Sequence, residues 1–242
     1  MAARRPAGAT KTIARSARKP GVRELSAQAT RESLLRAAIK VFAKHGLSGA
    51  SIEKISQQAK SHDRMVYYYF GSKEGLFVAA LEETYRRFNE AEAALDLDLG
   101  RPVESLLALV SFMMSYYRRN PEFVTLLNSE NLHRGRHIGK SLRSGEYSSH
   151  AIAVVDRVLT SGVERGQFRA DIRARDVYLL IASTGYFVQS NRHTLSAFLG
   201  EKLDSPEAVA HWESFVKQVV LRTVCLAAPA AARPAVQTAA TA

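Results

Sequence analysis

The chain has 242 residues, 46% of them hydrophobic, and a formal net charge of +11, so it can bury the core of one large domain or two smaller ones. Its single cysteine, Cys225, excludes an intramolecular disulfide, and no uncharged apolar run reaches the length of a transmembrane helix. These properties predict a globular cytoplasmic protein.

The excess positive charge is concentrated near the N-terminus. Residues 1–30 contain seven cations and one acid, residues 31–81 contain eight cations and four acids, and the remaining residues contribute only +1. This distribution predicts that a polyanion binds there through phosphate contacts. Residues 1–27 lack apolar periodicity and predict a disordered basic arm, which we interpret as an arm that follows a DNA groove. A mitochondrial targeting peptide would share this composition.

Two short helices are predicted first. The first begins after Thr30, a plausible N-cap, and ends at Gly46, which tolerates the left-handed conformation common at helix ends. Its apolar residues recur with the spacing of one helix face: Leu34, Leu35, Ala38, Val41 and Phe42. The second helix begins at Ser51 and ends near Ala59.

A third helix is predicted over Asp63–Tyr69, with Val66 and Phe70 directed inward. Ser72 then caps a fourth helix, which we expect to run to about Ala94 and to link two domains.

These segments resemble the N-terminal domain of TetR-family transcriptional regulators. The resemblance is carried by Ala37, Ala38, Phe42, Gly46, Ile55, Ala59, Tyr67, Phe70, Lys73, Glu74 and Leu76. It implies a helix-turn-helix domain over residues 28–81, whose third helix enters the major groove of DNA. It also implies a C-terminal domain that binds a small effector and dimerises.

The residues expected to contact DNA lie at helix starts, in the turn and on the third helix: Ser51, Lys60, Ser61, His62, Asp63, Arg64, Met65, Tyr67, Tyr68 and Lys73. Tyr67, Tyr68 and Lys73 suit phosphates, whereas the planar fork of Arg64 suits guanine. For each of these residues, the alternative to a DNA contact is that the side chain packs in the core or is only a solvated surface charge. The turn reads Lys-Ser-His where the family usually has Gly-Val-Ser, so Lys60 must accept a positive φ or alter the turn.

The rest of the chain predicts an all-helical C-terminal domain over residues 95–226, followed by a disordered tail over 227–242. Residues 95–102 read as a linker, and Pro121 and Gly166 act as helix breakers. Helices are expected at 102–118, 121–132, 140–165, 173–197 and 205–226. The fold class is therefore all-α, with about nine helices.

The last two helices carry heavy apolar faces, formed by Val177, Leu180, Ile181, Thr184, Phe187, Trp212, Phe215, Val216, Val219 and Val220. Two such helices per subunit predict a four-helix homodimer interface. The alternative is that these faces close the core of the subunit itself.

A polar segment flanked by apolar residues predicts an effector pocket, formed by Phe123, Leu127, Asn128, Asn131, His133, Arg134, His137, Tyr186, Gln189 and Ser190. Its cations favour an anionic or carboxylate-bearing ligand, although surface charges would explain them equally well. Glu130, His133 and His137 have a helical spacing compatible with zinc, but such pairs often arise by chance and no cysteine is near. We expect no metal or other cofactor.

Neither a glycine-rich phosphate loop nor a nucleophile elbow is present, so no enzymatic activity is expected. The predicted function is a homodimeric, nucleoid-associated repressor that binds a palindromic operator in double-stranded DNA and is released by a small effector. A dimeric activator, or a constitutive regulator without an effector, is the alternative.

Overall fold

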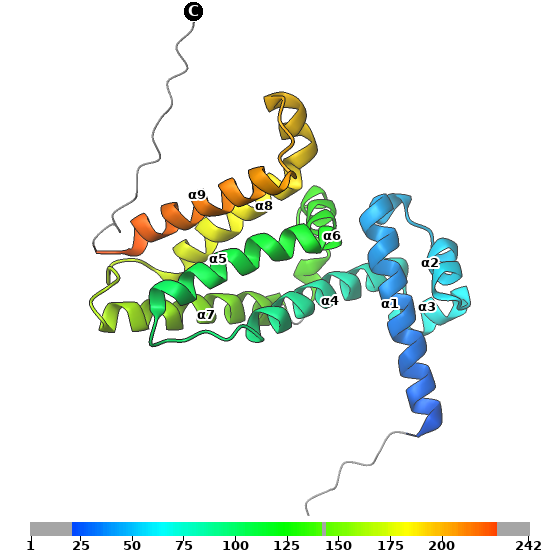
Figure 1. The fold of residues 1–242 in the computed structure, drawn as a ribbon. Coiled ribbons are helices and arrows are strands. Elements are labelled where there is room, and N and C mark those ends of the chain that lie inside the picture. Colours follow the sequence, from blue (N-terminus) through cyan, green and yellow to red (C-terminus); the bar gives the residue numbers. More distant parts are fainter. Residues whose placement is uncertain (1–20, 142–143, 227–242) are drawn as a thin grey trace, which may run out of the picture.

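The computed structural model describes residues 21–141 and 144–226, which are helical with short connections (Figure 1). Its elements are α1 (Val22–Gly49), α2 (Ile52–Ala59), α3 (Asp63–Phe70), α4 (Lys73–Ala93), α5 (Pro102–Arg119), α6 (Pro121–Leu132), the 3-10 helix η1 (Ile138–Lys140), α7 (Ser144–Glu164), α8 (Ala174–Leu199) and α9 (Pro206–Val224). β-structure in these ranges is limited to one bridge between Phe168 and Cys225. The predicted all-α fold is confirmed.

α1 begins at Val22, so the expectation of a disordered arm is wrong for residues 22–27. The backbone N–H of Gly21 donates to Glu24 Oε2 at 2.8 Å. This hydrogen bond gives a partner to one of the free N–H groups at the N-terminal end of the helix. Side chains 22–29 are all exposed, so the extension shows no apolar periodicity. Residues 1–20 of the predicted arm and the predicted tail over 227–242 lie outside the described residues.

The head of the molecule consists of α1, α2, α3 and the first half of α4. Its core contains Leu34, Ala38, Phe42, Ile55, Val66, Leu76, Phe77 and Leu81. The rings of Phe42 and Phe77 meet edge to face with centroids 5.1 Å apart. Leu126 of α6 is fully buried in the same core, so the head packs directly on the C-terminal part.

The C-terminal part encloses a second core between α5, α7, α8, α9 and the second half of α4. Phe88, Tyr117 and Phe123 stack within it, with centroid separations of 5.6 to 6.3 Å. Figure 1 shows α4 running from the head into this part, with α8 and α9 side by side. α4 is therefore positioned to transmit a displacement between the two cores.

Prolines define several helix starts, because Pro102, Pro121 and Pro206 occupy the first turns of α5, α6 and α9. The predicted helix over 140–165 corresponds to α7, which begins four residues later, after the separate 3-10 helix η1. Within the described ranges, no helix combines the length and apolar character that a membrane span requires.

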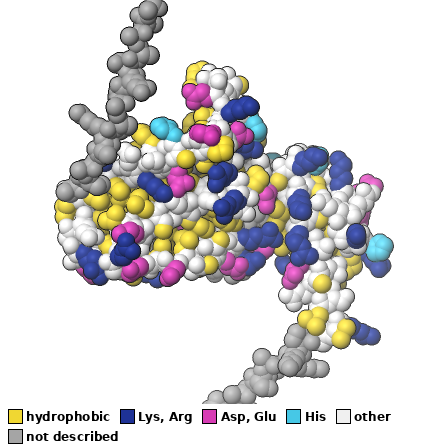
Figure 2. Space-filling model, viewed as in Figure 1, with side chains coloured by type: hydrophobic (Ala, Val, Ile, Leu, Met, Phe, Trp, Pro, Cys, Tyr) yellow, Lys and Arg dark blue, Asp and Glu magenta, His cyan; other side chains and the backbone are white. Residues whose placement is uncertain are grey.

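Figure 2 shows Lys and Arg side chains over the head and broader apolar areas on the C-terminal part.

Candidate DNA-binding surface and ligand cavities

The turn between α2 and α3 keeps a left-handed residue without glycine. Lys60 has φ 53° and ψ 45°, and its N–H donates to the carbonyl of Gln57 at 3.1 Å. The N–H of Ser61 closes the turn by donating to the carbonyl of Ser56 at 2.9 Å. The chain thus accepts the conformational cost of a left-handed lysine at this position.

α3 exposes most of the residues predicted to contact DNA. Tyr67 and Tyr68 are 55% and 77% exposed, while Val66 is fully buried beneath them. His62, Asp63 and Arg64 at the start of α3 are also exposed. Met65 was expected to face outward, but it is half-buried, because this side of α3 packs against the head core. The first turn of α3 thus presents cationic, acidic and imidazole groups together.

The remaining predicted DNA contacts lie at two helix starts. Ser51 accepts a hydrogen bond from the N–H of Lys54 at 3.2 Å and so begins α2. Ser72 caps α4 by accepting from the N–H of Gly75 at 3.0 Å, and the adjacent Lys73 is half-buried. A cation beside the α4 N-terminus supplements backbone N–H groups that favour an anion.

A tyrosine-lined cavity of about 390 Å³ lies between α4, α6 and α8. We define it by Leu81, Tyr85, Tyr117, Phe123, Leu127, Glu130, Asn131, Gly135, Ile138, Tyr178, Leu179, Ala182, Ser183 and Tyr186. Four of the ten predicted effector residues line it: Phe123, Leu127, Asn131 and Tyr186. Its volume lies in the range of roughly 300–1,000 Å³ typical of small-molecule pockets.

The tyrosine hydroxyls of this cavity remain protonated at neutral pH. Burial raises the pKa of Tyr85 to about 12 and that of Tyr117 well above its ordinary value, and it also raises the pKa of Tyr178 and Tyr186. The described lining contains no lysine or arginine. Arg134 is exposed and does not line the cavity. This cavity therefore has no arginine or lysine to support the predicted binding of an anionic ligand.

Other predicted effector residues join helices and do not line this cavity. Asn128 Oδ1 accepts hydrogen bonds from the hydroxyl of Tyr186 and from Ser190 Oγ, the latter at 3.0 Å. These bonds link α6 to α8 and fix the Tyr186 ring at the cavity wall. Gln189 faces a different cavity, which lies between α5, α8 and α9.

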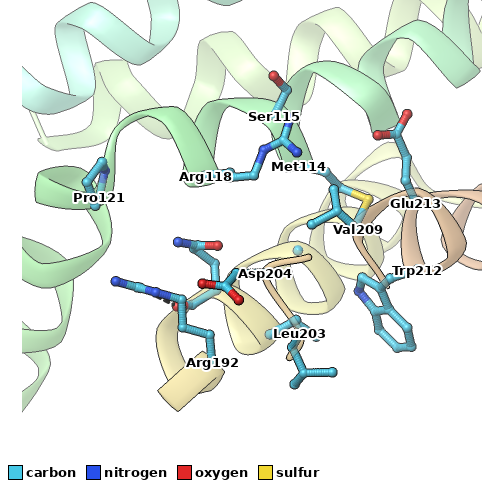
Figure 3. Close-up of a pocket in the computed structure, with 13 residues that line it drawn as sticks. Met114, Ser115, Arg118, Pro121, Arg192, Leu203, Asp204, Val209, Trp212 and Glu213 are labelled. Atoms are coloured by element: carbon cyan, nitrogen blue, oxygen red, sulfur yellow. Dashed lines mark hydrogen bonds between the residues drawn. The ribbon is translucent and has the colours of Figure 1, made fainter. Parts of the chain in front are cut away.

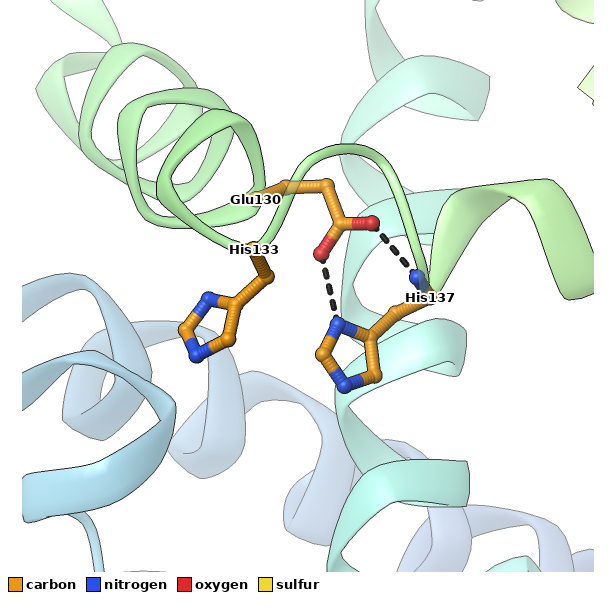
Figure 4. Close-up of side chains that lie close together, drawn as sticks. All are labelled: Glu130, His133 and His137. Atoms are coloured by element: carbon orange, nitrogen blue, oxygen red, sulfur yellow. Dashed lines mark hydrogen bonds and ion pairs between the residues drawn. The ribbon is translucent and has the colours of Figure 1, made fainter.

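Glu130, His133 and His137 form a compact cluster at the end of α6 (Figure 4). Glu130 Oε1 accepts from the backbone N–H groups of His137 at 2.6 Å and Ile138 at 2.9 Å, and Oε2 lies 2.8 Å from His137 Nδ1. His133 Nδ1 lies 2.7 Å from the carbonyl of Ser129. Each of the three offers a ligand atom within 4.8 Å of the others, and because both Nδ1 atoms are engaged, a metal would have to bind at the Nε2 atoms of the histidines. The cluster primarily fixes the turn that follows α6.

The same cluster connects the tyrosine-lined cavity to the head. Glu130 lines the cavity, and its partner His137 packs edge to face on Phe77 of α4 at 5.3 Å. Phe77 in turn packs on Phe42 of α1 at 5.1 Å. A continuous series of contacts therefore runs from the cavity to the helix that supports α2 and α3.

A second cavity, of about 280 Å³, lies between α5, α8 and α9 (Figure 3). We call it the arginine cavity; its lining includes Met114, Arg118, Gln189, Arg192, Trp212 and Glu213. These residues come from three helices, of which α5 is distant in sequence from the consecutive α8 and α9. It shares no lining residue with the tyrosine-lined cavity.

The apolar faces of α8 and α9 divide between the subunit core and the surface. Val177, Ile181, Val216 and Val220 are buried inside the subunit, as the alternative interpretation expected. Phe187 and Phe215, in contrast, are 56% and 49% exposed. Exposed phenylalanines on adjacent helices provide apolar surface for association.

Comparison with known proteins matches both parts of the chain. Residues 34–80 match the family model "Bacterial regulatory proteins, tetR family", and residues 102–220 match the "Tetracyclin repressor-like, C-terminal domain". Over 205 residues the chain is 50% identical to the HTH-type transcriptional repressor NicS of Pseudomonas putida, an alignment that covers 85% of this chain and 97% of NicS. The chain belongs to the TetR family. It is a DNA-binding transcriptional regulator, as the resemblance of its N-terminal segment implied.

More distant comparisons place this TetR-family regulator among proteins of the same fold. It is 28% identical over 165 residues to the HTH-type transcriptional repressor SCO4008 of Streptomyces coelicolor, covering 66% of this chain and 79% of that protein. A TetR transcriptional regulator from Chloroflexus aurantiacus aligns with a TM-score of 0.62 and 20% identity, over 84% of this chain and all of that one. The fatty acid degradation regulator FadR from Bacillus halodurans aligns with a TM-score of 0.61 and 20% identity, over 84% and 97% of the two chains.

Two features of this TetR-family protein were not predicted from its sequence. A Cβ atom at Gly75 would lie 2.2 Å from the carbonyl oxygen of Phe70. The close approach of α3 and α4 at this position therefore requires a glycine. A glycine in a helix first turn was the available signal. The arginine cavity had no local signal, because Arg118, Arg192 and Trp212 belong to separate helices.

Proposed function

We propose that the protein is a homodimeric repressor that leaves its operator when a small effector enters the tyrosine-lined cavity. The observation that carries this proposal is the continuous contact series from Glu130 through His137 and Phe77 to Phe42. NicS and SCO4008 are both named as repressors, which supports the sign of regulation.

The proposed DNA contacts follow from exposure and chemistry. Arg64, His62 and Asp63 lie at the start of α3, where a helix-turn-helix protein reads base edges. Tyr67 and Tyr68 offer exposed hydroxyls to phosphates. The phosphate backbone of the DNA would be held by Ser51, Lys60, Ser61 and Lys73. Met65 supports α3 from the core side.

The proposed effector response passes through α4. Leu81 and Tyr85 of α4 line the tyrosine-lined cavity, and Glu130 lines it from α6. A ligand that displaces either wall would move α4 relative to α1 and change the spacing of the two α3 helices in a dimer. Such a change lowers DNA affinity only to the extent that the ligand prefers the displaced state.

The proposed dimer places α8 and α9 of the two subunits together, with Phe187 and Phe215 between them. Two copies related by twofold symmetry would present their α3 helices to two half-sites, which accounts for a palindromic operator. This arrangement doubles the phosphate contacts available to the basic head.

The proposed function can be tested by selecting DNA sequences from a random duplex library with the full-length protein. We expect a palindrome whose half-sites are about one helical turn apart. On that operator, Tyr67→Phe combined with Lys73→Ala should weaken binding about tenfold at physiological salt, because two phosphate contacts are lost. Enrichment of a sequence without twofold symmetry would contradict the dimeric mechanism, and undiminished binding by the double variant would contradict the phosphate contacts.

A further inference from the structure

We propose that the arginine cavity is a second small-molecule site, which binds a compact carboxylate-bearing molecule. Figure 3 shows Arg118 from α5, Arg192 from α8 and Trp212 from α9 around this cavity. The site is independent of the tyrosine-lined cavity, since the two share no lining residue.

The two arginines are available to an anion. Within the described part of the chain, neither Arg118 nor Arg192 has a carboxylate within 4.0 Å. Arg192 Nη1 donates to the carbonyl of Gln189 on the same helix at 3.0 Å, a bond that leaves other guanidinium N–H groups unused. Guanidinium groups pair with carboxylates through two parallel hydrogen bonds.

The acids at the cavity do not cancel this positive charge. Glu213 already accepts hydrogen bonds from Ser111 Oγ and Lys217 Nζ, each at 2.7 Å. The lining contains two arginines and two acids, and Lys217, which does not line the cavity, neutralises Glu213 through its ion pair. Asp204 and Arg118 are both exposed, so solvent and salt screen their charges alike, whereas Arg192 is half-buried. An entering carboxylate would therefore meet a local excess of positive charge.

The apolar wall suits a single flat ring or a short chain. Met114, Val188 and Val209 line the cavity beside Trp212, whose Nε1–H donates to the carbonyl of Thr184 at 3.4 Å and so orients the indole. The volume of about 280 Å³ falls just below the range of roughly 300–1,000 Å³ for drug-sized ligands. The geometry therefore selects a small acid, with its carboxylate at the arginines and its apolar part at Trp212.

The test uses the full chain and three probes that share one ring but differ in charge: benzoate, benzyl alcohol and benzylamine. Isothermal titration should show that benzoate binds more tightly than either of the other two. Arg118→Gln and Arg192→Gln should each weaken benzoate binding about tenfold or more, because a charge-assisted pair is lost. Arg119→Gln is the matched control, since Arg119 is the exposed neighbour on α5 and does not line the cavity.

The location of the bound probe is tested with Asn131→Ala, which alters only the tyrosine-lined cavity. Benzoate affinity should be retained in this variant. The proposal is overturned if benzoate binds no better than benzyl alcohol, or if Arg119→Gln weakens it as much as Arg118→Gln. Loss of binding in Asn131→Ala with retention in Arg118→Gln would also overturn it, by placing the acid in the other cavity. Thermal unfolding of each variant without ligand checks that the substitutions leave the fold intact.

Discussion

At the scale of single residues, Lys60 combines two roles that substitutions can separate. Its φ of 53° carries the left-handed strain of a non-glycine residue, and its charge lies in the turn before α3. Lys60→Gly should raise the free energy of unfolding by about 0.5–1 kcal/mol, because the relief of strain exceeds the extra chain entropy of glycine. Urea unfolding measures this change.

Lys60→Ala is the control for Lys60→Gly, since it removes the charge and keeps the strain. Both variants should bind an operator more weakly than wild type, and by similar factors, if the ammonium group contacts a phosphate. Equal stability of the two variants would show that the left-handed backbone at this position carries no measurable strain.

A second residue with a distinct physical signature is Glu92, which is 1% exposed and has neither carboxylate oxygen hydrogen-bonded within the described part of the chain. Burial raises its pKa from 4.5 to about 7. Because the folded-state pKa is the higher one, the unfolded chain loses this proton first as pH rises. Stability therefore falls between about pH 4.5 and 7, by roughly 3 kcal/mol in total.

Glu92→Gln should remove this pH dependence. The variant is expected to be more stable than wild type by about 1–3 kcal/mol at pH 8, where the buried carboxylate is charged, and close to wild type at pH 5. Chemical unfolding at the two pH values measures the difference. An equal effect at both pH values would mean that Glu92 is already ionised in the folded protein at pH 5.

At the scale of elements, the packing of α3 on α4 depends on Gly75. The side-chain carbon of an alanine at this position would lie 2.2 Å from the Phe70 carbonyl oxygen, which is far inside van der Waals contact. Gly75→Ala should therefore lower the free energy of unfolding by about 1–3 kcal/mol and weaken operator binding, since α3 must shift. Thermal unfolding and fluorescence anisotropy on operator DNA measure the two effects.

Gly49→Ala provides the comparison for Gly75→Ala, because a Cβ atom there would make only an ordinary 3.6 Å contact with His45. It should leave DNA binding unchanged and stability within about 0.5 kcal/mol of wild type. If the two glycine variants behaved alike, tight α3–α4 packing would not be the cause of the Gly75 effect.

Element boundaries were predictable where local chemistry determines them. Pro121 separates α5 from α6, and Ser72 caps α4 through its hydroxyl, both as the sequence indicated. The start of α1 at Val22 was missed because an exposed helix has no apolar face to reveal it. Similarly, the inward orientation of Met65 depends on tertiary packing that periodicity in an eight-residue helix does not define.

In the candidate sites too, features set by local sequence were predictable and features set by tertiary packing were not. Exposure of Tyr67 and Tyr68 followed from the periodicity around buried Val66. The arginine cavity could not be predicted, because Arg118 and Arg192 converge only after α5 and α8 pack together. Long-range convergence of side chains is a property of the tertiary fold, and a single sequence carries no direct record of it.

At the scale of the whole molecule, the exposed aromatic surface of α8 and α9 determines the proposed assembly. Phe187 and Phe215 are about half exposed in the single subunit. Replacing both with glutamate would place two like charges per subunit in the proposed interface, where burying unpaired charge is costly. We expect the wild-type protein to be a dimer at micromolar concentration and the double variant to be a monomer, as measured by light scattering.

Leu132→Glu tests whether this dimer depends specifically on α8 and α9. Leu132 is 85% exposed at the end of α6, so its replacement adds one glutamate charge, against two in the double variant, to a surface outside the proposed interface. This variant should remain dimeric and retain operator binding, while the double variant should lose at least about tenfold in affinity because only one half-site is engaged at a time. A double variant that remained dimeric would move the interface to another face, and the twofold arrangement of the α3 helices would have to be derived from that face instead.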